Sequence, residues 1–287
     1  MTDFDPVYYT DPNAKPPKQV RRTSAGRLLT VAIVTLLTMC VLSNVVGRVL
    51  KDIRTPSPAQ EQRLERVEAA MLQCQEDVRQ AYFSTNSGEE YAEASRKVLN
   101  ESIARVERVA TGQTVVDYVA RAVAKFLREN RPQIEAHLDL LTQAERTGAF
   151  EPALASSQSE LREHIQTLAD LIALTEARLE SLKGYSSFIR AELETAGFRK
   201  REIDRVAASA RSGMYSSGAL RVQELDIEIL TNTRECAELL LRSWGAWELD
   251  EVDGLLFERD EDVDRFNELV GLIQDAAAEQ ESIMRGD

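Results

Sequence analysis

The chain has 287 residues, of which 29% are charged, and a formal net charge of −13. Binding to DNA or RNA depends on Lys and Arg side chains that neutralise phosphates, so this balance disfavours a nucleic-acid partner. The same acidic excess predicts a soluble surface that does not adhere to anionic lipid.

The N-terminal 27 residues contain four prolines and scattered polar residues, with no apolar pattern to bury. Such a composition is typical of disordered chain. We therefore expect residues 1–27 to form a disordered tail, which carries the basic residues that set membrane topology.

A run of twenty residues without a charge extends from Leu28 to Gly47. Twenty helical residues measure about 30 Å, the thickness of the hydrocarbon core of a bilayer. The run predicts a single transmembrane helix over residues 28–50. A signal peptide cleaved after Gly47 is the alternative, but the run is longer than a usual signal-peptide core of ~7–15 residues and follows an unusually long N-terminal region. We favour an uncleaved signal-anchor.

Basic residues flank this segment unequally. Five lie in the fifteen residues before Leu28 and three in the fifteen after Gly47. The more basic side usually faces the cytoplasm, which predicts a cytoplasmic tail and an extracytoplasmic C-terminal domain. Seven Lys or Arg and three Asp in residues 1–51 give +4, so the remainder of the chain carries −17.

A joint over residues 51–58 ends in Thr-Pro-Ser-Pro, and helical periodicity begins directly after it. Apolar residues spaced 3 and 4 apart form a heptad seam from Leu64 to Ala81. A second pattern covers 89–111 and resumes after Gly112. Pro132 is expected to end or kink that helix, with Asn130 capping the next one.

Ser157 and Glu160 form a capping-box pattern ahead of the most regular apolar seam, which we expect Gly184 to stop. Two short amphipathic pieces follow over 184–218. A long central helix is predicted from Ala219 to Trp247, and a last helix from about Asp260.

No window alternates with the period of a strand, and hairpin turn signals are absent. The predicted fold class is therefore all-α: a single N-terminal transmembrane helix followed by an elongated antiparallel bundle of six or more helices with coiled-coil-like seams. The bundle domain would cover 59–287, as one unit or as two sub-bundles divided near 148–156 or 184–218.

Catalytic and ligand signatures are missing from the sequence. A Ser-His-Asp order, a glycine-rich phosphate loop and a Gly-x-Ser-x-Gly elbow do not occur, so we predict neither an enzyme nor a cofactor. His164 with Glu160 and Glu163 could form half of a metal site, but a solvated helical pair is the commoner meaning of this spacing.

Asp260, Asp262 and Asp264 imitate the opening of a calcium loop. Arg265 stands where that loop requires glycine, and Gly271 where it requires a bidentate glutamate. We favour a solvated acidic turn, and we predict no metal site anywhere in the chain.

Two groups of residues are candidates for contact with a protein partner. Trp244 and Trp247 share one helical face, where tryptophan serves equally as a binding hot spot or as filler at the end of a bundle, and we favour the second. The other group is the one basic cluster beyond the membrane flank, with a solvated helical face as its alternative: Arg199, Lys200, Arg201, Arg205 and Arg211.

Cys40 lies in the predicted membrane span, which leaves Cys74 and Cys236 in the bundle domain. An oxidising compartment would permit a disulfide between them if their helices are neighbours. Two buried free thiols are the alternative, and the commoner one.

These observations favour a membrane-anchored scaffold or interaction protein, which docks other membrane or envelope proteins, or a second copy of itself, at the bilayer surface. The alternative is a single-pass sensor whose extracytoplasmic bundle binds a small ligand and signals through a partner protein, since 27 residues are too few to fold into an output domain. Architecture alone does not decide between the two.

Overall fold

The computed structural model describes residues 58–84, 87–216, 218–250 and 254–285. The predicted tail (1–27), the predicted transmembrane segment from Leu28 and the joint up to residue 57 all lie outside the described residues. Among the helices that are described, none is both long and apolar enough to cross a bilayer.

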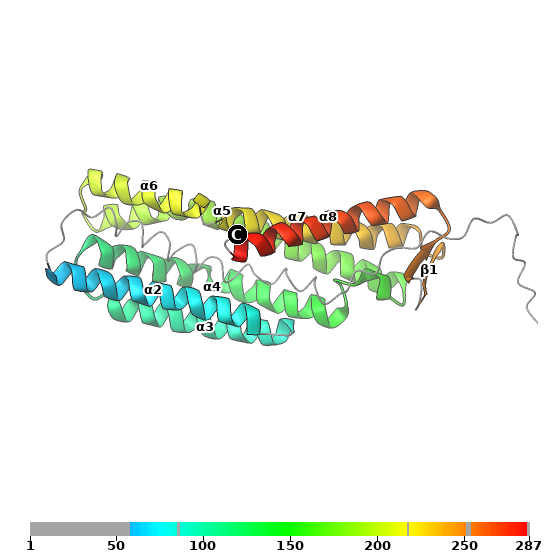
Figure 1. Ribbon diagram of the computed structural model, residues 1–287, viewed down its shortest axis with the longest axis horizontal. Coiled ribbons are helices and arrows are strands. Elements are labelled where there is room, and N and C mark those ends of the chain that lie inside the picture. Colours follow the sequence, from blue (N-terminus) through cyan, green and yellow to red (C-terminus); the bar gives the residue numbers. More distant parts are fainter. Residues whose placement is uncertain (1–57, 85–86, 217, 251–253, 286–287) are drawn as a thin grey trace, which may run out of the picture.

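Most described residues are helical, which confirms the all-α bundle in outline (Figure 1). The described part contains seven α-helices, a short 3-10 helix and two short strands. In chain order they are α2 (Pro58–Ser84), α3 (Gly88–Val109), α4 (Val115–Thr147), η2 (Pro152–Leu154), α5 (Gln158–Thr195), α6 (Lys200–Ser216), α7 (Ala219–Arg242), β1 (Trp247–Asp250), β2 (Gly254–Phe257) and α8 (Asp260–Arg285).

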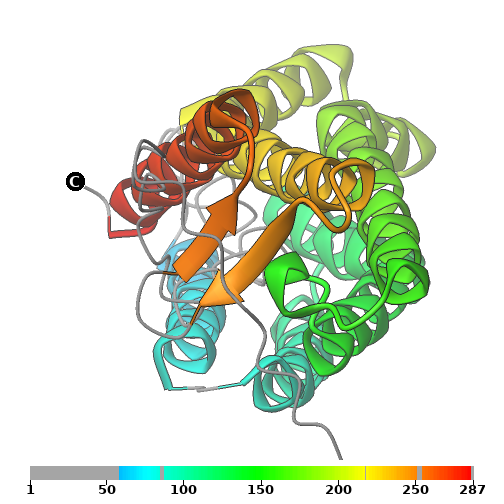
Figure 2. The ribbon, with the colours of Figure 1, turned by 90° about the vertical axis from the view of Figure 1, so that its right-hand side faces the viewer.

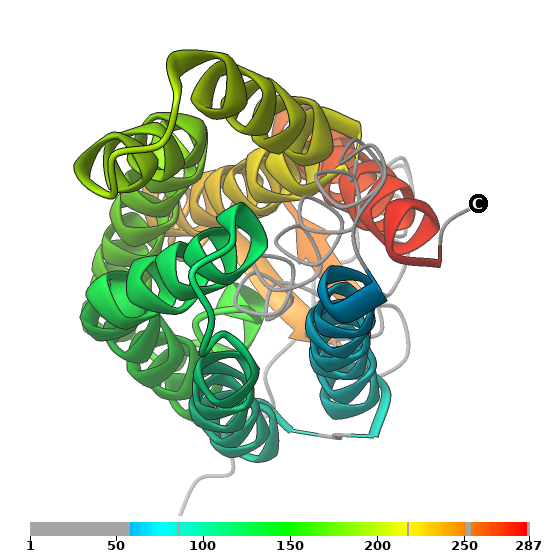
Figure 3. The ribbon, with the colours of Figure 1, turned by 90° about the vertical axis from the view of Figure 1, so that its left-hand side faces the viewer.

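The bundle is elongated, and its two longest helices, α4 and α5, run along most of its length (Figure 1). The helices α2 and α3 accompany them in one half, and α7 and α8 in the other. Along the row α2, α3, α4, α5, α7 and α8 each helix packs on the next, while α6 lies on α5. The end views show this row as a curve, with the two strands at one end (Figure 2) and the start of α6 at the other (Figure 3).

The core is one connected cluster of buried apolar side chains to which all seven helices contribute. The longest helix, α5, shows how this cluster overrides local preference. Gly184 was expected to end the helix, but α5 continues to Thr195. A glycine inside a helix costs about 1 kcal/mol relative to alanine. Burial of Tyr185, Ile189 and Leu193, each at 0% exposure, outweighs that cost.

Pro132 was expected to end or kink a helix, and it does not end one; the prediction that Asn130 caps a new helix is wrong. Both residues lie inside α4, and the Asn130 amide donates to the Phe126 carbonyl at 2.8 Å. Proline removes one backbone hydrogen bond. The apolar face of α4 keeps its register past this point, since Ile134 and Leu138 are both buried, and packing therefore holds the helix together.

The prediction of a strand-free domain is also wrong. The chain leaves α7 at Arg242 and turns at Gly245, whose φ of +87° favours glycine. It then forms the antiparallel hairpin β1–β2, in which Trp247 pairs with Phe257. Each strand has four residues, too few to show a clear period of two. The central helix therefore ends five residues before its predicted limit at Trp247.

Candidate functional site

The basic cluster predicted as a partner surface lies on the outside of α6. Arg199 precedes the helix, and all five basic side chains are exposed. The opposite face of α6 is buried through Ile203, Val206 and Ala210. Lys200 pairs with Asp204 at 3.0 Å, and Arg190 of α5 pairs with the same carboxylate at 2.7 Å. Residues 199–216 contain five basic and two acidic residues, so this segment keeps a net positive charge.

A pocket of about 270 Å³ lies beside this face, between α5, α6 and the start of α7. Its lining includes Arg211 and Tyr215 of α6 and Lys183 of α5. Lys183 donates to Glu180 at 2.7 Å, and this contact raises the pKa of the lysine. The pocket therefore opens onto the basic surface and combines cations, hydroxyls and an exposed aromatic ring, because Tyr215 is 69% exposed.

The two tryptophans are not part of this surface. They lie at the hairpin end of the bundle, opposite the start of α6 (Figure 1). Their rings meet edge to face, with centroids 5.4 Å apart, and Trp247 Nε1 donates to the Leu240 carbonyl at 2.9 Å. Both are partly buried against the core. A ring whose N–H is satisfied internally is typical of filler at a bundle end.

The weak metal candidates have other roles in the structure. His164 is 2% exposed, and its Nε2 donates to the Thr147 carbonyl at 2.7 Å, which ties the start of α5 to the end of α4. Asp260 and Asp262 lie in the first turn of α8, where carboxylates complement the helix dipole. Among the described residues, no group of three or more His, Cys, Asp or Glu could hold a metal ion.

The candidate disulfide is not formed. Cys74 of α2 and Cys236 of α7 are both buried free thiols. Arg105 Nη1 lies 3.7 Å from the Cys74 sulfur, and burial raises the pKa of Cys236 to about 12.

A buried polar group that sequence reasoning missed crosses the middle of the bundle. Arg178 of α5, Asp226 and Gln223 of α7, Gln280 of α8 and His137 of α4 are each at most 4% exposed. Gln280 Nε2 donates to Asp226 Oδ1 at 2.7 Å, and Gln223 Nε2 approaches Oδ2 at 3.4 Å. We call these five residues the buried polar layer.

Burial decides the charge states of this layer. Desolvation raises the pKa of Asp226 well above its usual value, although the Gln280 hydrogen bond and the Arg178 charge oppose the rise. Desolvation lowers the pKa of Arg178 to about 10. It also lowers the pKa of His137 to about 3, with the Arg178 charge acting in the same direction. His137 is therefore neutral at physiological pH, and neither ring nitrogen has a hydrogen-bond partner.

The sequence does hold a signal for this layer. Arg178 lies three residues after the buried Thr175 and four before the buried Leu182, in register with an apolar seam. Asp226 lies four residues after the buried Val222 and three before the buried Ile229 of α7. A charged residue in register with a buried stripe is the pattern to look for.

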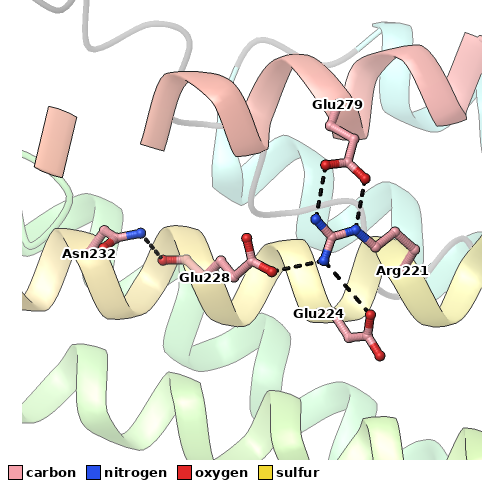
Figure 4. Close-up of polar contacts among 5 residues, drawn as sticks. All are labelled: Arg221, Glu224, Glu228, Asn232 and Glu279. Atoms are coloured by element: carbon pink, nitrogen blue, oxygen red, sulfur yellow. Dashed lines mark hydrogen bonds and ion pairs between the residues drawn. The ribbon is translucent and has the colours of Figure 1, made fainter. Parts of the chain in front are cut away.

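At the surface, Arg221 joins α7 to α8 (Figure 4). Its guanidinium makes two parallel hydrogen bonds to Glu279, at 2.7 and 2.9 Å, and a third to Glu228 at 2.8 Å. Glu224 lies 3.8 Å away. Glu279 and Glu228 raise the pKa of Arg221, and this cation is neutralised within the molecule.

Comparison with known proteins does not add to these observations, since no protein-family model, no curated protein and no solved structure matches the chain significantly.

Proposed function

We propose that the protein is a membrane-anchored helical-bundle scaffold, which docks proteins at the bilayer surface through the exposed basic face of α6. The observation that carries this proposal is a cluster of five exposed basic residues, Arg199 directly before α6 and four on the helix, in a chain of net charge −13. Charge complementarity of this kind steers association and fixes register. The charge-free segment 28–47, predicted as the anchor, would keep the bundle at the membrane.

A photo-reactive amino acid at position 208 tests the proposal. Ala208 is exposed and lies on the outer face of α6, between Arg201 and Arg211. Irradiation of intact membranes is expected to give a protein adduct at this position. The same amino acid at Ala177, exposed on α5, serves as the matched control and is expected to give none.

The adduct at position 208 is expected to disappear when Arg201→Glu and Arg211→Glu reverse the charge of the face. Arg162→Glu, at an exposed position of α5, is expected to leave it intact. Adducts that are equally strong at positions 208 and 177, or that survive the charge reversal, would contradict docking through α6.

The alternative, a ligand sensor, draws support from the buried polar layer. The ring nitrogens of His137 and the side-chain carbonyls of Gln223 and Gln280 are buried without partners, and such groups would gain from a small polar ligand. Thermal-shift screening of the full-length protein in detergent tests this function. A hit lost in the variant Gln280→Leu, with the fold retained, would favour the sensor over the scaffold.

A further inference from the structure

The outer faces of α6 and α8 carry opposite charges. On α6 the exposed residues recur every three or four positions, at Arg201, Arg205, Ala208, Ser212 and Tyr215. The exposed stripe of α8 follows the same period, through Glu261, Asp264, Glu268, Leu272, Asp275 and Glu279. Residues 199–216 hold five basic and two acidic residues, a net of +3, whereas α8 holds eight acidic and two basic, a net of −6.

The two helices lie on the same long side of the bundle. In all three views of the ribbon, α6 and α8 are in the upper half (Figures 1, 2 and 3). Along the long axis they lie toward opposite ends, and each runs from its end toward the middle (Figure 1). The upper part of the bundle therefore holds a net basic helix toward one end and a net acidic helix toward the other (Figure 1).

Each stripe also exposes one large apolar side chain in its inner half. Tyr215 near the end of α6 is 69% exposed, and Leu272 of α8 is 46% exposed. Few large apolar side chains of the described part are this accessible. An apolar contact surrounded by charged pairs is a common composition for a protein interface.

We infer that the protein forms an antiparallel two-fold dimer, in which α6 of each copy lies against α8 of the other. This inference rests on the proposed docking surface and names its partner as a second copy. A two-fold axis through the middle of this side places the start of α6 opposite the start of the partner's α8. The basic stripe then meets the acidic stripe twice, and the interface is closed and self-complementary. Tyr215 and Leu272 approach each other near the axis.

Charge reversal provides the test. Arg201→Glu with Ala208→Glu makes both stripes acidic. Glu261→Lys, Glu268→Lys and Asp275→Lys together reverse the net charge of the α8 stripe, so that both stripes are basic. Full-length wild-type protein in detergent is expected to sediment with the protein mass of two 32.2 kDa chains. Each reversed variant alone is expected to be monomeric. The matched control Arg162→Glu with Ala177→Glu makes the same chemical changes on α5, and is expected to stay dimeric.

An equimolar mixture of the two reversed variants is the decisive sample. In a heterodimer of these variants, both α6–α8 contacts again join opposite charges, so dimers are expected to return. The dissociation constant is expected to rise on the order of tenfold between low and high salt, because exposed charges are screened. A wild-type protein that is monomeric at every concentration, or a mixture that does not dimerise, would overturn the inference. If the dimer is contradicted in this way but position 208 still gives adducts with a different protein, the proposed scaffold function remains supported.

Discussion

Gln280 on α8 donates a hydrogen bond of 2.7 Å to Asp226 on α7, and both side chains are completely buried. The contact fixes the register of α8 on α7 from inside the core, while Arg221 and Glu279 fasten the same two helices at the surface. Burial raises the pKa of Asp226, so the carboxyl group keeps its proton to a higher pH than usual. The protonated form avoids the free-energy cost of burying a charged carboxylate. The α7–α8 pair is thus specified by polar contacts inside and outside.

Asp226→Asn is expected to change the free energy of unfolding by less than about 1 kcal/mol, because the new amide oxygen still accepts from Gln280 and carries no charge. Asp226→Leu leaves the buried amides of Gln223 and Gln280 without an acceptor, which costs about 1–3 kcal/mol for each orphaned group. Denaturant titration of the full-length protein in detergent measures both. Equal losses for Asn and Leu would show that the hydrogen bonds do not matter.

His137 is expected to lower the free energy of unfolding as the pH falls below its ordinary pKa. Its pKa is about 3 in the folded state against an ordinary value of 6.5, so the unfolded chain binds a proton first as the pH falls. The contribution of this residue to the free energy of unfolding is therefore complete above pH 6.5 and is lost progressively between pH 6.5 and 3, by on the order of 5 kcal/mol. The difference in stability between wild type and His137→Leu, followed over this range, should shrink or reverse at low pH. A constant difference would exclude this role.

Two glycines with left-handed backbone form a matched pair for mutation. Gly148 has a φ of +74° with open space around its missing side chain, and Gly218 has a φ of +71°. A Cβ at position 218 would lie 2.5 Å from Cγ2 of Ile283 on α8. Gly148→Ala is expected to cost about 1–2 kcal/mol for the backbone alone. Gly218→Ala is expected to cost more, since it also displaces the end of α8, and thermal unfolding compares the two.

The thiols supply a test of helix placement. Cys74 and Cys236 are free, so two thiols of the bundle should react with a maleimide in denaturant without prior reduction. Native protein should react slowly at Cys236, because burial raises its pKa to about 12 and hides the sulfur. Labelling that requires reduction first would mean that α2 and α7 are neighbours.

Much of the helical architecture could be predicted from apolar spacing. The seam beginning at Leu161 and the start of the last helix at Asp260 are where the periodicity places them. Pro132 and Gly184 usually interrupt helices, but here α4 and α5 continue through them. Tertiary packing compensates the missing hydrogen bond of the proline and the low helix propensity of the glycine. The hairpin was missed because four-residue strands carry too little pattern.

Of the candidate functional residues, too, one group could be predicted from the sequence and the other was missed. Exposure of the basic residues follows from charge and period, so the outer face of α6 could be predicted. The buried polar layer was not predicted. Arg178 and Asp226 are each in register with an apolar stripe, but the sequence does not show which helices pack together. Only the packing of α5 on α7 buries them together.

Membrane attachment and orientation are the most direct test of the anchored scaffold. We expect the full-length protein to remain in the membrane fraction after an alkaline wash. A reporter active only outside the cytoplasm should be active when fused to Asp287, while a cytoplasmic reporter at the same site should be silent. A chain released by the wash would contradict the anchor, and an active cytoplasmic reporter at Asp287 would contradict the extracytoplasmic placement of the bundle.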